Sequence, residues 1–384
     1  MINLEDIFYK VFDANVEYVY KTPGRVNLIG EHIDYNGGVV LPAAISRYVY
    51  LYVSIRVDKK IKISSSYFGT TFERSLDDVE YRKEDDWATY GFGVFYILQK
   101  LGHVIPKGLN ILIDSTIPLA SGLSSSSAFL DAMLFMLNDL FRLKISKTDL
   151  VHIAKRVENE YCGVATGVMD QSSIMFGEKN KAVLLNTRDI SYELVEINLG
   201  DYTFAILQTN KERRLVESKY NERVSECGDA LKLIKENYKD IEYLTDLKID
   251  DLVKVQSFMP DVLFRRTRHI VTEQQRVYDF VAKLKDGNIK KLGEILNLSH
   301  ESLKSDYEVT GVHLDTICEL ARINGAVGAR MTGAGFGGCA LAIVRKDEFN
   351  AFKEKIIAGY KEKLDINADV FTVDIVRGPK RMQL

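Results

Sequence analysis

Four side chains that can bind ligands or move protons lie close together near the start of the sequence. They are Arg25, Glu31, His32 and Asp34, within the glycine-containing segment Pro23–Gly38 just ahead of a hydrophobic strand. A sugar presents hydroxyls that both donate and accept hydrogen bonds, so a site that selects one stereoisomer needs fixed carboxylates and amides at several angles. The segment is typical of a site that grips a hydroxyl-rich small molecule.

Two more loops and a lone acid follow downstream. The serine-rich loop Pro118–Ala128 joins a predicted strand to a predicted helix, so its backbone N–H groups and the positive helix end point at one anion. The glycine loop Thr332–Gly338 lets backbone approach a ligand because it carries few side chains. Asp170 lies between them in Gly167-Val-Met-Asp-Gln171. Together these segments predict a small-molecule kinase.

Each loop taken alone has a plainer interpretation. Serines are also favoured helix N-caps, and Gly333–Gly338 formally matches the dinucleotide fingerprint Gly-x-Gly-x-x-Gly. A Rossmann turn leads into a helix, whereas Cys339–Val344 has the pattern of a strand. A turn between two strands is therefore the better interpretation. The sequence contains no Gly-x-x-x-x-Gly-Lys-Ser/Thr run, so phosphate must be neutralised without a Walker lysine.

The three loops, in this order and with Met-Asp-Gln before the third, resemble the galactokinase branch of the superfamily named for galactokinase, homoserine kinase, mevalonate kinase and phosphomevalonate kinase. Gly24–His32 followed by Asp34-Tyr-Asn is similar to that branch's own signature, and the resemblance runs from about Val19 to Val376. It implies an α+β fold of two lobes with the active site in the cleft between them. It also implies transfer of the γ-phosphoryl group of ATP to the C1 hydroxyl of D-galactose.

The resemblance assigns residues to this chemistry. It implies a sugar site at Glu31, His32, Asp34, Gly167 and Tyr220. It implies an ATP site at Gly122, Leu123, Ser124, Ser125, Ser126, Ser127, Gly333 and Gly335, with Trp87 near the adenine, and Mg²⁺ ligands at Ser126 and Glu158. We expect Asp170 to accept or orient the C1 hydroxyl proton, and Arg25 to hold Asp170 ionised and stabilise the transferring phosphate.

Several alternatives stay open at this point. Trp87 fits a core position equally well, and the run Glu212-Arg213-Arg214 fits a phosphate contact or a solvated face. Ala165-Thr166 departs from the usual residues of the family, so N-acetylgalactosamine, galacturonate or arabinose compete with galactose as the sugar. A non-catalytic sugar sensor is the third alternative, but such sensors can lose residues of the serine loop, which is complete here.

The elements that must position these residues follow from periodicity. Strands are predicted at 48–57, 61–65, 109–114, 182–186, 202–208, 338–344 and 370–376. Helices are predicted at 87–100, 128–138, 147–160, 216–238, 264–284, 289–303, 314–323 and 348–364. We place the lobe boundary near Gly200, giving lobes of 1–199 and 200–384, and expect a terminal strand at about 368–378 to pack on the first lobe.

Composition excludes several classes of function. At 384 residues the chain is long enough for two cores, and a formal charge of −3 with mixed signs offers no broad cationic face for nucleic acid. We find no apolar run of spanning length and no secretory start, so we expect a cytoplasmic protein. Its four scattered cysteines fit reduced thiols. The resemblance implies a monomer, with galactose and ATP as its partners.

Overall fold

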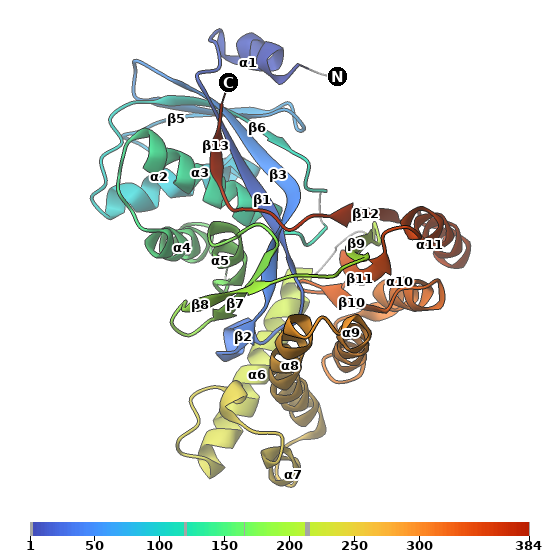
Figure 1. Ribbon diagram of the computed structural model, residues 1–384. Helices are drawn as coiled ribbons and strands as arrows, with labels where there is room; N and C mark the ends of the chain where they lie inside the picture. The colour runs from blue at the N-terminus through green and yellow to red at the C-terminus, as the bar shows by residue number, and fades with distance from the viewer. Residues whose placement is uncertain (1–2, 119–120, 165, 212–215, 384) are drawn as a thin grey trace.

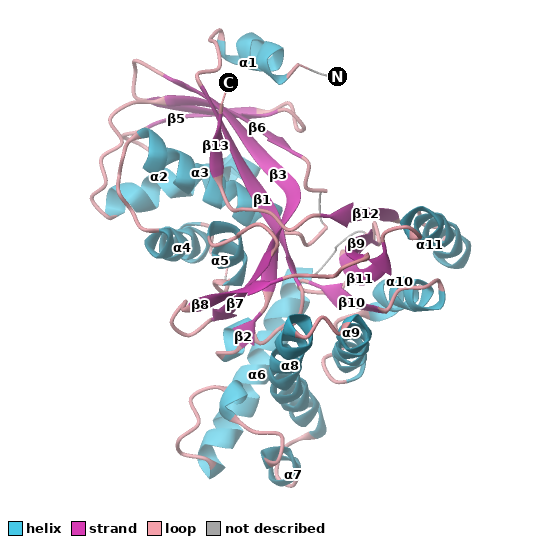
Figure 2. Ribbon diagram, viewed as in Figure 1, coloured by secondary structure: helices cyan, strands magenta, loops and turns pink. Residues whose placement is uncertain are grey.

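Three sheets organise the protein, whose computed structural model describes residues 3–118, 121–164, 166–211 and 216–383. A six-stranded sheet and a four-stranded sheet lie side by side, and a small three-stranded sheet lies below the first (Figure 1). Helices pack on one face of the six-stranded sheet and against the four-stranded sheet (Figure 2). The expected mixture of helices and strands is confirmed.

The six-stranded sheet has the strand order β13-β1-β3-β6-β4-β5, and only β4 and β6 pair in parallel. Its strands are β1 (Tyr18–Asn27), β3 (Pro42–Ile55), β4 (Lys60–Ser65), β5 (Thr71–Ser75), β6 (Leu109–Ser115) and β13 (Lys380–Met382). The helices α2 (Thr89–Lys100), α3 (Ser125–Leu140), α4 (Lys147–Arg156) and α5 (Met169–Met175) gather on one face (Figure 1). On the other face, Phe8 and Phe12 of α1 (Leu4–Phe12) pack on Leu112 of β6.

The four-stranded sheet has the order β10-β11-β9-β12 and is antiparallel throughout. Its strands are β9 (Tyr202–Gln208), β10 (Gly328–Thr332), β11 (Cys339–Arg345) and β12 (Asp369–Val373). It packs against α9 (Ile289–Ser305), α10 (Gly311–Ile323) and α11 (Phe349–Leu364). The turn between β10 and β11 is the glycine loop, so the strand pair expected there in place of a Rossmann turn is confirmed.

The remaining elements lie below the two large sheets. The three-stranded sheet contains β2 (Val39–Val40), β7 (Lys181–Asn186) and β8 (Tyr192–Glu196), in the order β2-β7-β8. The helices α6 (Val216–Asn237), α7 (Asp251–Gln256) and α8 (Asp261–Lys285) extend away from the sheets (Figure 1). Among the described residues, no helix combines the length and apolar character that crossing a bilayer requires.

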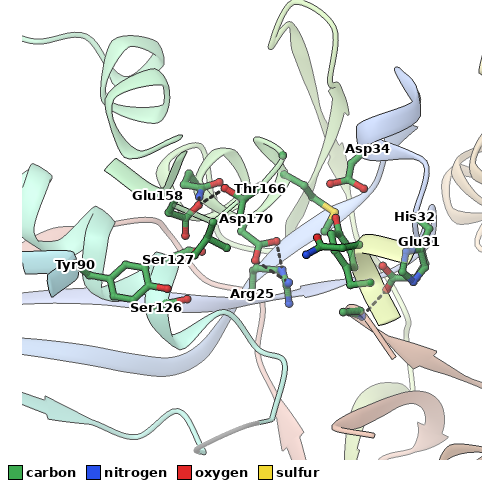
Figure 3. A pocket seen from close by; sticks show the side chains of 18 of the residues that line it. Arg25, Glu31, His32, Asp34, Tyr90, Ser126, Ser127, Glu158, Thr166 and Asp170 are labelled. Atoms are coloured by element: carbon green, nitrogen blue, oxygen red, sulfur yellow. Dashed lines mark hydrogen bonds and ion pairs between the residues drawn. The ribbon is translucent and has the colours of Figure 1, made fainter. Parts of the chain in front are cut away.

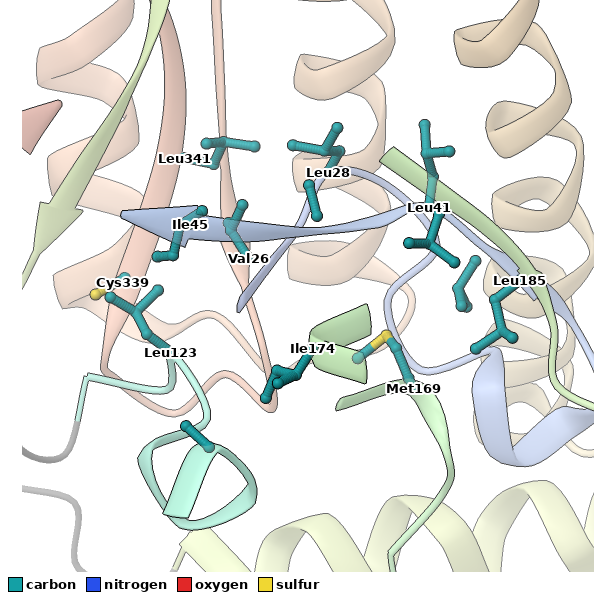
Figure 4. Close-up of a cluster of buried hydrophobic side chains, with 14 of the residues drawn as sticks. Val26, Leu28, Leu41, Ile45, Leu123, Met169, Ile174, Leu185, Cys339 and Leu341 are labelled. Carbon is teal, nitrogen blue, oxygen red and sulfur yellow. The ribbon is translucent and has the colours of Figure 1, made fainter. Parts of the chain in front are cut away.

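One hydrophobic core runs through both halves of the chain. Val26 and Leu28 of the first half belong to the same buried cluster as Cys339 and Leu341 of β11, and Figure 4 shows these side chains close to Ile45. All of these side chains are fully buried. Burial on this scale contributes about 25 cal/mol for each Å² of apolar surface, so the continuous core fixes the position of β1 relative to the glycine loop.

Two expectations about chain segments need correction. The segment containing Arg25, which the sequence pattern presents as a loop, begins as the ten-residue strand β1. Of the terminal segment expected at about 368–378 on the first lobe, only the first part departs from its expected place, because β12 pairs with β9. It is the following segment that reaches the first sheet, where Ile375 bridges Ile45 and β13 pairs with β1. The lobe boundary near residue 200 stays a prediction.

Candidate active site

A cavity of about 890 Å³ lies between residues from both halves of the chain. In Figure 3 Tyr90, Ser126, Ser127 and Glu158 lie at one end of it and Glu31, His32 and Asp34 at the other, with Arg25 and Asp170 between them. Gly333 and Ala334 of the glycine loop and Tyr220 of α6 also line it. Its volume falls within the range of about 300–1,000 Å³ that is usual for small-molecule sites.

Arg25 and Asp170 form a two-pronged ion pair at the centre of this cavity. Nε of Arg25 donates to Oδ1 of Asp170 at 2.8 Å, and Nη2 donates to Oδ2 at 2.9 Å. The third nitrogen, Nη1, donates to the carbonyl of Gly122 at 2.6 Å. The partner carboxylate raises the pKa of Arg25 despite its burial, so the guanidinium stays charged. The two residues lie 145 positions apart and meet as the sequence predicts.

The backbone of β1 explains how Arg25 reaches this position. The pairing of β1 with β3 shifts register between Pro23 and Gly24, a bulge that re-aims the next side chain. A Cβ on Gly24 would lie 2.7 Å from the carbonyl oxygen of Leu123, so only glycine permits this approach. The same carbonyl accepts a hydrogen bond from the backbone N–H of Arg25 at 3.2 Å. The first and second sequence loops are therefore in direct contact.

The serine-rich loop meets Asp170 through Ser124. This residue precedes α3 with a left-handed backbone (φ 61°), and its hydroxyl donates to Oδ2 of Asp170. Ser126 and Ser127 in the first turn of α3 line the cavity, next to the positive end of the helix. Leu123 is buried in the core and contributes through its backbone, and Leu119 and Ala120 of the same loop lie outside the described residues.

The glycine loop closes on the serine loop from the second half. Gly333, with φ 85°, approaches so closely that a Cβ there would lie 3.2 Å from the carbonyl oxygen of Gly122. Gly335, with φ 80°, leaves no room for a side chain, since a Cβ would lie 2.3 Å from the carbonyl oxygen of Val309. These two positions require glycine for conformation and for space.

Glu158 lies in a single π-turn, Val157–Tyr161, that follows α4. Such turns interrupt the regular advance of a helix and are frequent at functional sites. Oε2 of Glu158 accepts hydrogen bonds from the hydroxyl of Thr166 and the amide of Gln171, both at 2.5 Å. Burial raises the pKa of Glu158 to about 7, and the nearby charge of Asp170 adds to this effect. Sequence reasoning missed the role of Thr166 and Gln171 as supports of this carboxylate.

Aromatic side chains lie beside the serine end of the cavity. Tyr90 lines the cavity. Trp87 is absent from the described lining and packs on Phe68, with ring centroids 5.9 Å apart, and on Phe72 at 5.7 Å. Phe68 is 50% exposed, so this aromatic group stands partly open to solvent. The run Glu212-Arg213-Arg214 lies outside the described residues.

At the other end, Glu31 is held by groups of the second half. Its Oε1 accepts from the backbone N–H of Gly333 at 2.8 Å and from Nη2 of Arg330 at 3.1 Å. Arg330, on β10, is fully buried and also donates to the carbonyls of Asn27 at 2.7 Å and Leu28 at 2.9 Å. Sequence reasoning missed Arg330, although a charged residue between the apolar neighbours of a buried strand is an available signal.

Helix α8 supports the same segment from below. Glu273 is fully buried, and its Oε1 accepts from the backbone N–H of Gly30 at 3.0 Å. The ring of His269 contacts the carbonyl oxygen of Glu31 through Nε2 at 3.1 Å, and Nδ1 pairs with the hydroxyl of Ser302. Because a carbonyl only accepts, Nε2 is the protonated nitrogen. These contacts give His269 and Glu273 a structural role.

His32 lies in a group of aromatic rings. Its ring centroid is 4.7 Å from that of Tyr307, 5.8 Å from Tyr220 and 6.0 Å from Tyr35. Nδ1 pairs with the hydroxyl of Tyr35 at 3.0 Å, whereas Nε2 is buried without a hydrogen-bond partner among the described residues. Burial lowers the pKa of His32 to about 3, so the ring is neutral and one nitrogen remains available to a polar ligand.

Asp34 completes the carboxylate end. Burial raises its pKa to about 7, with further contributions from the negative charges of Asp170 and Glu31. A Cβ on Gly167 would lie 2.5 Å from Oδ2 of Asp34, which explains why a glycine stands there. The expected sugar-site residues Glu31, His32, Asp34, Gly167 and Tyr220 all line one cavity with Asp170. Their assigned roles remain proposals.

An arginine–aspartate pair joins a carboxylate-rich pocket to a helix end lined by glycine and serine. This arrangement is that of a small-molecule kinase of the superfamily named for galactokinase, homoserine kinase, mevalonate kinase and phosphomevalonate kinase (GHMP). The family model for the GHMP kinases N terminal domain matches residues 90–178, and the model for GHMP kinases C terminal matches residues 280–362. The galactokinase galactose-binding signature matches residues 6–55, and the galactokinase of Enterococcus faecalis is 43% identical over 98% of each chain. The chain belongs to the galactokinase family.

Other relatives agree with this placement. The galactokinase of Staphylococcus carnosus is 41% identical over the full length of both chains. The crystal structure of Lactococcus lactis galactokinase complexed with galactose superimposes with a TM-score of 0.94 at 41% identity, over 99% of each chain. Methanococcus jannaschii mevalonate kinase, at 19% identity and a TM-score of 0.69, shares the fold.

Proposed function

We propose that the protein transfers the γ-phosphoryl group of ATP to the C1 hydroxyl of D-galactose, giving galactose 1-phosphate and ADP. The observation that carries this proposal is the Arg25–Asp170 pair, which lies midway between the serine end and the carboxylate end of one cavity (Figure 3). Identity of 43% to a galactokinase along nearly the whole chain supports galactose as the acceptor.

Asp170 acts in this proposal on the acceptor hydroxyl. Its side chain is 27% exposed, so part of it faces the cavity. Arg25 and Ser124 donate hydrogen bonds to the same carboxylate. Each carboxylate oxygen can accept more than one hydrogen bond, so the C1 hydroxyl finds an acceptor there. Arg25 fixes the orientation of the Asp170 carboxylate through two hydrogen bonds and stabilises charge that develops on the transferred group. Asp170 therefore orients the hydroxyl and takes its proton.

The carboxylate end supplies groups for the remaining hydroxyls. Glu31 and Asp34 offer acceptors, His32 offers its unpaired Nε2, and Tyr220 offers a phenol. Gly167 holds open the space next to Asp34. Such a set rejects sugars that lack a matching hydroxyl, because the buried polar groups are then left without partners.

The serine end takes the nucleotide. Gly122, Ser124, Ser125, Ser126 and Ser127 bring backbone N–H groups to the N-terminus of α3, whereas Leu123 donates its N–H to Oγ of Ser121 at 3.3 Å. Gly333 and Gly335 bring a second backbone close. Unpaired N–H groups and the helix dipole favour phosphate oxygens. We place the adenine against the partly exposed aromatic group that contains Trp87 and Phe68.

The same end fits Mg²⁺. Ser126 and Glu158 both line it, and hydroxyl and carboxylate oxygens are the hard donors that this ion prefers. Thr166 and Gln171 donate to Oε2 of Glu158, and no described hydrogen bond involves Oε1, so that oxygen is available as a ligand. When bound, the ion neutralises charge on the β- and γ-phosphates. In our proposal Ser126 and Glu158 hold it.

Turnover with a panel of sugars tests the proposal. ADP release is measured at equal concentrations of galactose, N-acetylgalactosamine, galacturonate and arabinose, with and without MgCl₂. We expect galactose to be used fastest and the reaction to stop without Mg²⁺. Faster use of another sugar would overturn the choice of substrate, and the absence of ADP with every sugar would make the protein a sensor. We also propose that the protein acts in the cytoplasm, because ATP is supplied there, and that it is a monomer. Light scattering measures its mass in solution.

A further inference from the structure

A second cavity, of about 690 Å³, lies where the chain passes from the second half back to the first sheet. We call it the crossover groove. Its polar lining residues include Lys21 of β1, Tyr48 of β3, Lys179, Asp374, Arg377 and Lys380. None of these residues lines the active-site cavity, so the two sites are separate.

The groove contains an unusual pair of like charges. Lys21 and Lys380 stand directly opposite one another in the pairing of β1 with β13. Side chains at such positions have Cβ atoms about 4.5–5.5 Å apart, and like charges there are destabilising. Burial lowers the pKa of Lys21, and the charge of Lys380 lowers it further. The repulsion between the two ammonium groups lowers stability unless another group neutralises it.

The protein itself supplies little compensation. In the described part of the chain, no ion pair involves Lys21, Lys179 or Lys380, and Arg377 pairs with Glu178 at 2.5 Å. The Nζ atom of Lys21 lies 3.6 Å from the ring centroid of Tyr48, a contact that holds the ammonium in place without neutralising it. Asp374 is the one carboxylate in the lining, against four cations.

The walls of the groove are fixed by the backbone. The N–H of Val376 donates to the carbonyl of Ala44 at 2.9 Å, and the N–H of Gly378 donates to Gly177 at 2.9 Å. The N–H of Asn180 donates to Ile375 at 3.2 Å. Three chain segments far apart in sequence are therefore locked together around the four cations. A site whose walls are preorganised loses less entropy when a ligand binds.

We propose that the crossover groove binds a small phosphorylated anion. Three lysines and one arginine around one space suit a ligand with two or more negative charges, and ammonium groups are common phosphate binders. A monocarboxylate needs only one of these cations. The volume suits a metabolite, and the mixed surface charge of the chain supplies no extended cationic track for a nucleic acid.

Lysine protection in the full-length protein tests this proposal. The protein is treated briefly with an acetylating reagent, with and without inorganic pyrophosphate at constant ionic strength, and modified peptides are quantified. We expect pyrophosphate to slow acetylation of Lys21, Lys179 and Lys380 at least threefold, while the exposed Lys59 and Lys232 react unchanged. The proposal would be overturned if sodium chloride slowed acetylation of the groove lysines as much as pyrophosphate does. It would also be overturned if pyrophosphate protected the control lysines equally. Parallel runs with orthophosphate, a sugar phosphate and ADP identify the source of the phosphate.

Two variants separate the groove from the active site, which also attracts phosphate. Lys21→Gln/Lys380→Gln should lose protection of Lys179, whereas the matched control Lys59→Gln/Lys232→Gln should keep it. Lys380→Glu should raise the melting temperature of the free protein by about 1 °C, because it replaces a repulsion by an attraction, and should also abolish protection. Retained protection of Lys179 in both groove variants would overturn the proposal.

Discussion

Two arginine–carboxylate pairs contribute to one cavity and have different surroundings: Arg25, Asp170 and Glu31 line it, whereas Arg330 lies behind Glu31. In the Arg25–Asp170 pair, the side chains are 6% and 27% exposed, and the carboxylate faces the cavity. In the Arg330–Glu31 pair, they are 0% and 2% exposed, and the arginine donates to the backbone carbonyls of Asn27, the last residue of β1, and of Leu28. The comparison teaches that the first pair is placed to act on a ligand, whereas the second holds the ligand-binding segment in position.

The most damaging change to the first pair is Asp170→Asn. This substitution keeps the shape of the side chain but removes the base, so we expect kcat to fall by about 10²- to 10⁴-fold in a protein that still folds, although the buried Arg25 loses its charged partner and stability falls as well. ADP release and urea unfolding measure the two quantities. Asp229→Asn, on the exposed surface of α6, is the matched control. Near-normal turnover of Asp170→Asn would show that the first pair is structural as well.

The second pair is tested by Arg330→Met. Removing one partner of a buried pair leaves an uncompensated charge, so the free energy of unfolding should fall by about 3–5 kcal/mol. The KM for the sugar should rise more than kcat falls, because Glu31 loses its support. Arg345→Met, which breaks the exposed pair with Asp347, should change stability by no more than about 0.5 kcal/mol. Unchanged stability with lost turnover would reverse the roles of the two pairs.

Gly167→Ala tests the space that Gly167 leaves beside Asp34 in the cavity. The added methyl group would lie 2.5 Å from Oδ2 of Asp34, so the carboxylate must move. Overpacking of this kind amounts to about 1–3 kcal/mol, and we expect the KM for the sugar to rise about tenfold or more. Gly228→Ala is the control, because a Cβ there meets no atom within 4 Å. Equal effects of the two substitutions on KM would remove Asp34 from the sugar site.

The smallest effect concerns Asp34 and pH. Its pKa is raised from 3.8 to about 7, so the folded state binds the proton more tightly than the unfolded state does. The stabilisation linked to this proton is complete below the unfolded pKa and is lost as pH rises toward the folded pKa. Between pH 3.8 and about 7, the unfolding free energy of the wild type should therefore fall relative to that of Asp34→Asn. Urea titrations across this range measure the difference; parallel curves would contradict it.

Regular elements follow closely from the sequence. The strand predicted at 202–208 is β9 with the same bounds, and the helix predicted at 264–284 is α8, Asp261–Lys285. Both have a strong local period and clear ends. β1 was missed because Pro23 and Gly24 interrupt its pattern, although the shift of register lets the strand accommodate them. The short β13 depends on pairing with β1, which no local pattern encodes.

The site was predictable only in part. Arg25, Glu31 and Asp170 lie in segments whose residue types predict ligand binding or catalysis, and they line one cavity. Arg330 and Glu273 act through contacts with backbone that lies 302 and 243 residues away along the chain, so their partners are visible only in three dimensions. Composition and spacing therefore identify the groups that meet a ligand more readily than those that hold them in place.

The pairing of β13 with β1 has a consequence for synthesis of the protein. β1 and β3 leave the ribosome early, but the strand that covers the outer edge of β1 comprises residues 380–382. Domains commonly fold from the N-terminus while translation continues. Here the edge of β1 stays without its partner until residues 380–382 have been made, so a shorter nascent chain exposes an unpaired strand edge.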